Sequence, residues 1–193
     1  YGKSDAFTKI SVELSKQGNL KEAKEIAKNM KYDYDEAKIL KEISVELSKK
    51  QGKIALAINI AENISHDKYK YNAFADISVE LLKQGKTDES LKIVEKIDKK
   101  TFKSIALLKM AVEYSKQDKL EESDILINEL IKLTENVDVG LDISELLIEL
   151  SRELSLNGRL EKAELMIKKV IKLVAKFKND YSKVNTLKGI AVE

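Results

Sequence analysis

A five-residue pattern recurs along the chain, and this repetition constrains the fold more than any other feature. Its copies, three of which read Ile-Ser-Val-Glu-Leu in full, begin at Ile10, Ile43, Ile77, Met110, Leu150 and Ile190. Successive copies are 33, 34, 33, 40 and 40 residues apart. Such a period is typical of repeat proteins, in which one supersecondary unit stacks on the next and buries a continuous core.

Each copy of the pattern lies in a segment whose apolar residues have helical spacing, as Phe74, Ile77 and Leu81 show. A turn and a second apolar-periodic segment follow, so the unit is predicted to be helix A, a turn and helix B. The glycines expected to end helix A are Gly18, Gly52, Gly85 and Gly158. The side chains expected to cap the N-termini of helices are Asn19, Asp35, Asp67, Asp98, Asp118 and Asp180.

The two 40-residue periods predict longer second helices in repeats four and five, because seven extra residues make about two helical turns. We expect an all-α, right-handed α-solenoid of about 11 helices, which form five repeats and the first helix of a sixth. No linker interrupts the chain, so residues 1–193 are predicted to be one array. The expected repeats are residues 3–33, 34–67, 68–100, 101–138 and 139–179, with a partial repeat at 180–193.

Composition excludes several kinds of chemistry. The chain has no Cys and one His, His66, which excludes disulfides, thiol nucleophiles and a His/Cys metal cage. No Gly-rich phosphate loop, Ser/His/Asp set or HExxH pair is present, so we expect neither an enzyme, a metal site nor a cofactor. We expect His66 to have a surface or capping role. Tyrosines near the repeat junctions are expected to pack there, unless they form an exposed contact row: Tyr32, Tyr34, Tyr69 and Tyr71.

Charge gives little indication of a partner. The chain has 35 basic and 33 acidic residues, so its net charge of +2 disfavours nucleic acid and an anionic membrane. No apolar run approaches the about 20 residues that span a bilayer. The sequence does not determine the cellular compartment, and of the possible compartments the cytoplasm is favoured. In the C-terminal half, residues 121–149 are mostly acidic and residues 159–178 mostly basic, which predicts complementary neighbouring helices or a basic contact face.

The turn motifs resemble those of the tetratricopeptide repeat (TPR). Ser15-Lys-Gln-Gly18 followed by Glu22-Ala23, and Lys83-Gln-Gly85 followed by Glu89, carry this resemblance over nearly the whole chain. It implies a protein-binding scaffold whose concave face is lined by helix A. The departures are large residues late in helix B and no proline after it, so the units are TPR-like. The large residues are Met30, Ile64, Ile97, Leu130 and Val170.

Two special cases of the resemblance are disfavoured. Family members that bind the C-termini of chaperones use Lys and Asn at fixed positions in helix A. In the first repeat, Thr8 and Val12 occupy two of these positions, and Lys41 alone in the second repeat does not complete the set. The RNA-reading pentatricopeptide repeat uses a small polar residue early in helix A. The residues at that place form no such code: Thr8, Lys41, Ala75, Leu108 and Ile148.

Residues that recur on helix A are the candidates for binding a partner. With Lys41, the expected concave-face set comprises a valine row and a lysine row: Val12, Val45, Val79, Val112, Lys16, Lys49, Lys83 and Lys116. These rows fit a groove that takes an extended or helical peptide. In the alternative interpretation, the valines pack between neighbouring A helices. The glutamates of the pattern would then pair with the lysines three residues later.

The sequence therefore predicts a non-enzymatic scaffold that binds a protein or peptide segment on the concave helix A face. The alternative is a structural spacer or self-association module of a larger protein, and an RNA-binding array is a third, weaker hypothesis. Both ends of the chain fall inside a helix A pattern without a polar capping helix, although solenoids generally need one. We therefore expect a fragment of a longer protein.

Overall fold

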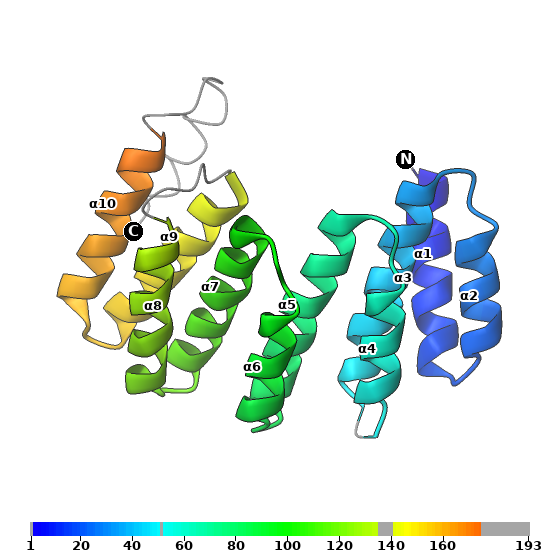
Figure 1. Ribbon diagram of the computed structural model, residues 1–193, viewed down its shortest axis with the longest axis horizontal. Helices are drawn as coiled ribbons and strands as arrows, with labels where there is room; N and C mark the ends of the chain where they lie inside the picture. Colours follow the sequence, from blue (N-terminus) through cyan, green and yellow to red (C-terminus); the bar gives the residue numbers. More distant parts are fainter. Residues whose placement is uncertain (1, 51, 135–140, 175–193) are drawn as a thin grey trace. The chain divides into compact units, whose positions relative to one another are not determined.

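The computed structural model describes residues 2–50, 52–134 and 141–174. Within these ranges the chain forms ten α-helices and no β-strand (Figure 1). The prediction of an all-α protein is therefore confirmed for the described residues. The expected eleventh helix, at residues 180–193, and the cap candidate Asp180 lie outside them.

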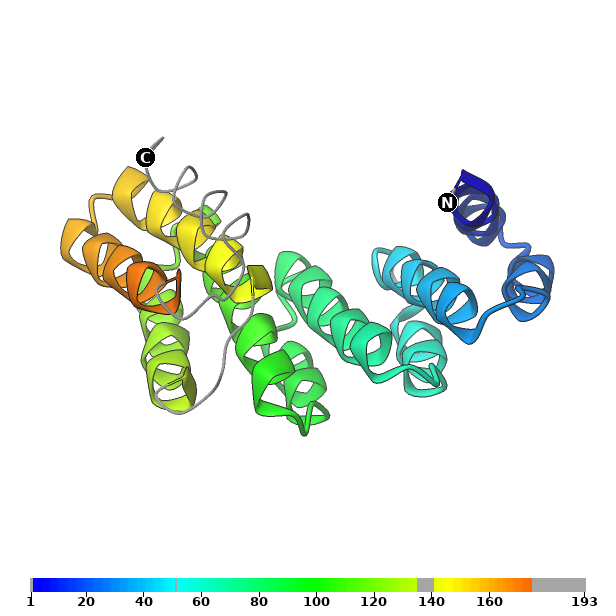
Figure 2. The ribbon, with the colours of Figure 1, turned by 90° about the horizontal axis from the view of Figure 1, so that it is seen from above.

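The chain divides into two compact units, Tyr1–Asp98 and Lys99–Glu193. The helices of the first unit are α1 (Gly2–Lys16), α2 (Leu20–Lys28), α3 (Asp33–Ser48), α4 (Ile54–Glu62), α5 (Asp67–Lys83) and α6 (Thr87–Glu95). Each odd-numbered helix packs against the even-numbered helix that follows it and against the neighbouring odd-numbered helix. In this unit α1, α3 and α5 therefore form one layer, and α2, α4 and α6 form the other (Figures 1 and 2).

The second unit contains two longer helix pairs. They are α7 (Lys100–Lys116) with α8 (Leu120–Thr134), and α9 (Leu141–Leu156) with α10 (Leu160–Val174). Helix α7 also packs against α9. Helices α8 and α10 have 15 residues each, whereas α2, α4 and α6 have nine. The prediction that the longer periods extend the second helices is thus confirmed.

Small side chains lie where the two helices of a pair cross. Ser44 and Ala57 are fully buried in one pair, and Ser78 and Ser90 in the next. The Ser90 hydroxyl donates a hydrogen bond of 2.8 Å to the carbonyl oxygen of Ser78. A larger residue at any of these places would push the helices apart, because interiors are close-packed. Around the crossings lie fully buried apolar residues that include Ile39, Ile43, Phe74, Ile77 and Leu81.

The turn between the helices of a pair requires a left-handed backbone. All four glycines predicted to end the first helix have positive φ angles, between 71° and 92°. Asp118, which we expected to cap the next helix, instead occupies this left-handed place with a φ of 57°. The expectation for Asp118 was therefore wrong. The fourth repeat has an aspartate where the other repeats have the glycine.

The other predicted caps also differ from the structure. Asn19 occupies the N-cap position of α2, but its side chain makes no capping hydrogen bond. Asp35 and Asp67 lie inside the first turns of α3 and α5, and Asp98 precedes the Lys99 N-cap of α7. Asp35 accepts a hydrogen bond of 2.6 Å from Ser4, and Asp98 accepts one of 2.5 Å from the Tyr71 hydroxyl. These carboxylates therefore connect segments about one repeat apart.

Side chains from the turns cap the preceding odd-numbered helix. The Gln84 amide donates a hydrogen bond of 2.7 Å to the carbonyl oxygen of Ser48, and the Asn157 amide donates one of 2.8 Å to that of Ser115. Carbonyl groups in the last turn of a helix have no partner within the helix. Each contact therefore satisfies a helix end and fixes the position of the neighbouring pair.

We expect the substitution Asp118→Gly to raise the free energy of unfolding by about 0.5–1 kcal/mol, because glycine adopts a positive φ without a steric cost. Urea denaturation followed by circular dichroism measures the change. Asp118→Asn is the matched control, since it removes the charge and keeps a side chain at this place. An Asp118→Gly protein no more stable than the wild type would show that this backbone conformation is not strained.

Candidate functional site

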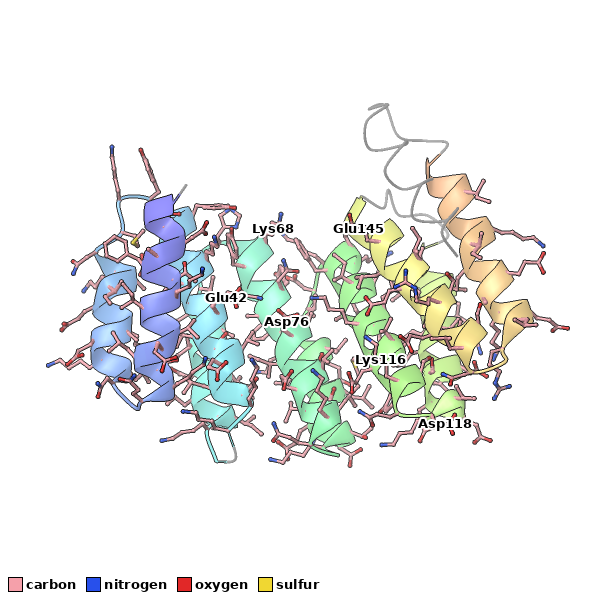
Figure 3. All side chains as sticks on the ribbon, turned by 180° about the vertical axis from the view of Figure 1, so that it is seen from behind. Glu42, Lys68, Asp76, Lys116, Asp118 and Glu145 are labelled. Carbon is pink, nitrogen blue, oxygen red and sulfur yellow. The ribbon has the colours of Figure 1, made fainter. Side chains whose placement is uncertain are left out.

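Each unit has its own candidate surface, the solvent side of its odd-numbered helices, which we call its odd-helix face: α1, α3 and α5 in the first unit, and α7 and α9 in the second. Figure 3 views the first unit from the side of these helices. In the first unit, Val12, Val45 and Val79 are each partly exposed. In the second unit, Val112 is only 4% exposed. This corrects the expectation for Val112, whose side chain packs in the interior and offers no surface to a partner.

The lysine row of the first unit is paired within each helix. Lys16 lies 3.6 Å from Glu13, Lys49 lies 3.0 Å from Glu46, and Lys83 lies 2.8 Å from Glu80. The expected pairing of each glutamate with the lysine three residues later is confirmed at these places. The side chains of Glu46 and Glu80 are 16% and 17% exposed, whereas those of Lys49 and Lys83 are 49% and 47% exposed. The lysine is therefore the more exposed member of each of these two pairs.

Lys116, the fourth lysine of the row, has a different partner. Its Nζ donates a hydrogen bond of 2.7 Å to Glu149 Oε1, so it connects α7 to α9. This hydrogen bond raises the pKa of Lys116 against the opposing effect of burial. Figure 3 labels Lys116 on this face. The interaction is one between neighbouring helices of the second unit, and the sequence pattern alone did not predict it.

Lys41 is the most enclosed lysine of the candidate set. Its Nζ lies 2.6 Å from Asp76 Oδ2 on α5 and 3.2 Å from Glu42 Oε1, and the side chains of Lys41 and Asp76 are only 18% and 20% exposed. Burial lowers the pKa of Lys41, but the attraction of Asp76 and Glu42 outweighs it, and the net shift is upward. Lys41 therefore joins α3 to α5, and a ligand carboxylate would have to displace Asp76 from it.

Ion pairs between neighbouring repeats are the feature that sequence reasoning missed. Lys38 on α3 lies 2.6 Å from Asp5 on α1, and Lys96 of the first unit lies 2.8 Å from Glu62. The exception is in the second unit, where Lys162 on α10 pairs with Asp124 on α8 and the opposite charges of the two segments had predicted complementary helices. The sequence feature that could have predicted these ion pairs is the presence of opposite charges at positions about one repeat apart.

The positions that would read RNA bases do not face the solvent. Thr8, Ala75, Leu108 and Ile148 are all less than 10% exposed. Lys41, at the remaining position, is held by Asp76. These side chains therefore present little surface at the positions where the pentatricopeptide repeat would read a base.

The tyrosines near the repeat junctions divide into two groups. Tyr71 is buried, and Tyr69 packs edge-on against Tyr34 with ring centroids 5.0 Å apart. His66, the N-cap residue of α5, is exposed and makes no side-chain capping bond, but its ring lies 6.0 Å from Tyr34 and 5.5 Å from Tyr69. Tyr32 and Tyr34 remain 59% and 52% exposed. Both packing and an exposed contact surface are therefore present.

In the part of the chain that the structure describes, no group of three or more His, Cys, Asp or Glu side chains could hold a metal ion. Among the helices of that part, none is both long and apolar enough to cross a membrane.

We expect Lys41→Met to lower the free energy of unfolding by about 2–3 kcal/mol, because the substitution removes one charged partner of Asp76 from a largely buried ion pair. Lys49→Met, which breaks a more exposed pair, should cost less than about 1 kcal/mol. Urea denaturation of both variants, of Asp76→Leu and of the Lys41→Met/Asp76→Leu double variant gives the coupling energy. Equal losses for Lys41→Met and Lys49→Met would contradict this account.

The pH dependence gives a second check on this ion pair. The folded-state pKa of Lys41 is raised above the ordinary value of 10.5. The contribution of Lys41 to stability should therefore be complete below pH 10.5 and be lost as the pH rises through the raised value. The difference in unfolding free energy between wild type and Lys41→Met, measured from pH 8 to pH 11.5, should stay constant and then decrease. A difference that grows above pH 10.5 would have the wrong sign.

Comparison of the chain with models of protein families, with curated proteins and with solved structures finds no match. The likeness to the tetratricopeptide repeat therefore stays an interpretation of the turn motifs and of the period.

Proposed function

We propose that this chain is a non-enzymatic, TPR-like α-solenoid that binds a protein or peptide segment on the odd-helix face of its first unit. The support is the regular recurrence of one sequence pattern, together with odd-numbered helices that lie side by side in one layer. Stacked helix pairs of this kind present extended surfaces to partners.

The observation that carries the proposal is the pair of partly exposed valines on adjacent helices, Val45 on α3 and Val79 on α5. They occupy equivalent places one repeat apart, and exposed lysines follow them at Lys49 and Lys83. A partner segment that crosses these helices would meet, at each repeat, an apolar side chain beside an exposed lysine that is paired with a glutamate of the same helix. Such regular spacing suits an extended or helical peptide. The second unit does not follow this pattern, because Val112, its equivalent of Val45 and Val79, is buried.

We expect Val79→Glu to weaken the binding of a peptide to this face by at least about tenfold, because burying an unpaired carboxylate at an interface is costly. A peptide that binds the purified chain is selected from a random displayed library, and its Kd is measured by fluorescence anisotropy. Val45→Glu should have the same effect.

The matched control is Leu91→Glu, which introduces the same charge at an exposed leucine of α6 in the other layer. Leu91→Glu should leave the Kd unchanged. A selected peptide that binds both valine variants as tightly as the wild type would place its site elsewhere. Circular dichroism spectra establish that each variant is folded.

Self-association is the second candidate function, and exposed apolar side chains of α10 favour it. Leu160 is 67% exposed and Ile171 is 49% exposed. The two residues are eleven positions apart, which is about three helical turns, so both lie on one side of the helix. Exposed apolar patches often mark contact sites between proteins. A second copy of the chain is the partner that this candidate requires.

If α10 mediates self-association, the mass measured by sedimentation equilibrium should rise with protein concentration. The double variant Leu160→Lys/Ile171→Lys should remain monomeric at the same concentrations. A wild-type protein that stays monomeric up to about 100 μM, a range in which weak but specific interfaces associate, would exclude this candidate.

A further inference from the structure

A pocket in the first unit lies apart from the valine row. Its volume is about 480 Å³, and its lining comes from α1, from α3 and from the segment just before α3. The lining residues are Ser4, Asp5, Tyr32, Tyr34, Asp35 and Lys38. The sequence indicates Tyr32 and Tyr34 as possible contact residues but does not predict a pocket, because the two parts of the pocket are about 30 residues apart in the chain.

The pocket gathers exposed aromatic rings. Among the Phe and Tyr residues whose side chains the structure describes, only Tyr32 and Tyr34 are more than half exposed. Tyr34 is held in place by its edge-on contacts with Tyr69 and His66. An exposed and already immobilised ring loses little conformational entropy when it binds, which is one reason why tyrosine is frequent in binding sites.

The ring of Tyr32 already accepts a cation from its own chain. The Nζ of Lys31 lies 5.2 Å from the centroid of the Tyr32 ring. Because the face of an aromatic ring carries partial negative charge, it attracts cations at such distances. The exposed rings of the pocket therefore favour a positively charged ligand over a carboxylate or a phosphate.

The charged side chains of the pocket lead to the same preference. Lys38 Nζ donates a hydrogen bond of 2.6 Å to Asp5 Oδ1, and Ser4 Oγ donates one of 2.6 Å to Asp35 Oδ1. Two carboxylates and one ammonium group give the lining a net charge of −1. A carboxylate accepts several hydrogen bonds, so Asp5 and Asp35 each keep accepting capacity. The acidic residues in the first turn of α3 also offset the partial positive charge of that helix end.

We propose that this pocket binds the guanidinium group of an arginine side chain on a partner protein. A planar guanidinium can stack on a tyrosine ring and donate parallel hydrogen bonds to one carboxylate, which an ammonium group cannot do. Tyr32 and Tyr34 supply the rings, and Asp35 supplies the carboxylate that no lysine occupies. The site is independent of the valine row, so either one can exist without the other.

The test is a titration of the ¹⁵N-labelled chain with N-acetyl-arginine amide, followed by two-dimensional NMR. Saturable shifts are expected in residues 4–5 and 32–38, with a Kd of about 1–10 mM, as suits so small a ligand. N-acetyl-citrulline amide has the same shape without the charge, and it should bind at least about fivefold more weakly. Shifts that do not saturate, or equal binding of the two compounds, would overturn the proposal.

Two variants locate the binding groups. Asp35→Asn should weaken the binding of N-acetyl-arginine amide about fivefold, and Tyr32→Ala about threefold. Asp88→Asn is the matched control, since Asp88 also lies in the first turn of a helix and is exposed. It should leave the Kd unchanged. Equal affinities of Asp35→Asn and Asp88→Asn would contradict the assignment.

The test of this pocket can be distinguished from the test of the valine row. Val79→Glu should not alter the binding of N-acetyl-arginine amide, and Asp35→Asn should not alter the binding of a peptide on the odd-helix face. A loss of both activities in a single variant, with a spectrum that is otherwise that of the folded protein, would contradict the independence of the two sites.

Discussion

Close approach of the two helices in each pair is the constraint on which the rest of the structure depends. Small side chains on both helices of a pair are fully buried, and Ser90 on α6 donates a hydrogen bond to the backbone of Ser78 on α5. Because the helices of a pair cannot separate without losing this contact, each odd-numbered helix has a fixed side toward its partner. The opposite side is then available to solvent or to another molecule, and it carries the partly exposed valines of the first unit.

Polar contacts determine how one pair joins the next. Within the first unit, Lys41 pairs with Asp76 and the Gln84 amide caps α3 at Ser48. Within the second unit, Lys116 pairs with Glu149. Lys41 and Lys116 thus join neighbouring helices, whereas Lys16, Lys49 and Lys83 pair with glutamates of their own helices. All the candidate lysines already have a carboxylate partner, so the valine row becomes the stronger candidate.

The parts of the structure that could be predicted are those that depend on local sequence. Helix periodicity, the left-handed glycines and the longer helices α8 and α10 all follow from spacing along the chain. The caps could not be predicted, because Asp35 and Asp98 bond to Ser4 and Tyr71 from other segments. Val112 occupies the same place in the pattern as Val79, yet it is buried, since burial depends on neighbours that differ between repeats. The tyrosine pocket likewise forms only when distant segments meet.

The central claim is that a partner segment lies across α3 and α5 on the odd-helix face. The most direct measurement is photo-crosslinking with benzoylphenylalanine in place of Val79, using a peptide selected on the wild-type chain and mass spectrometry to locate the link. The account predicts a crosslinked peptide from position 79 and none from the same substitution at Leu91. Crosslinking from position 91 alone would contradict it, because the peptide would then lie on the layer of even-numbered helices.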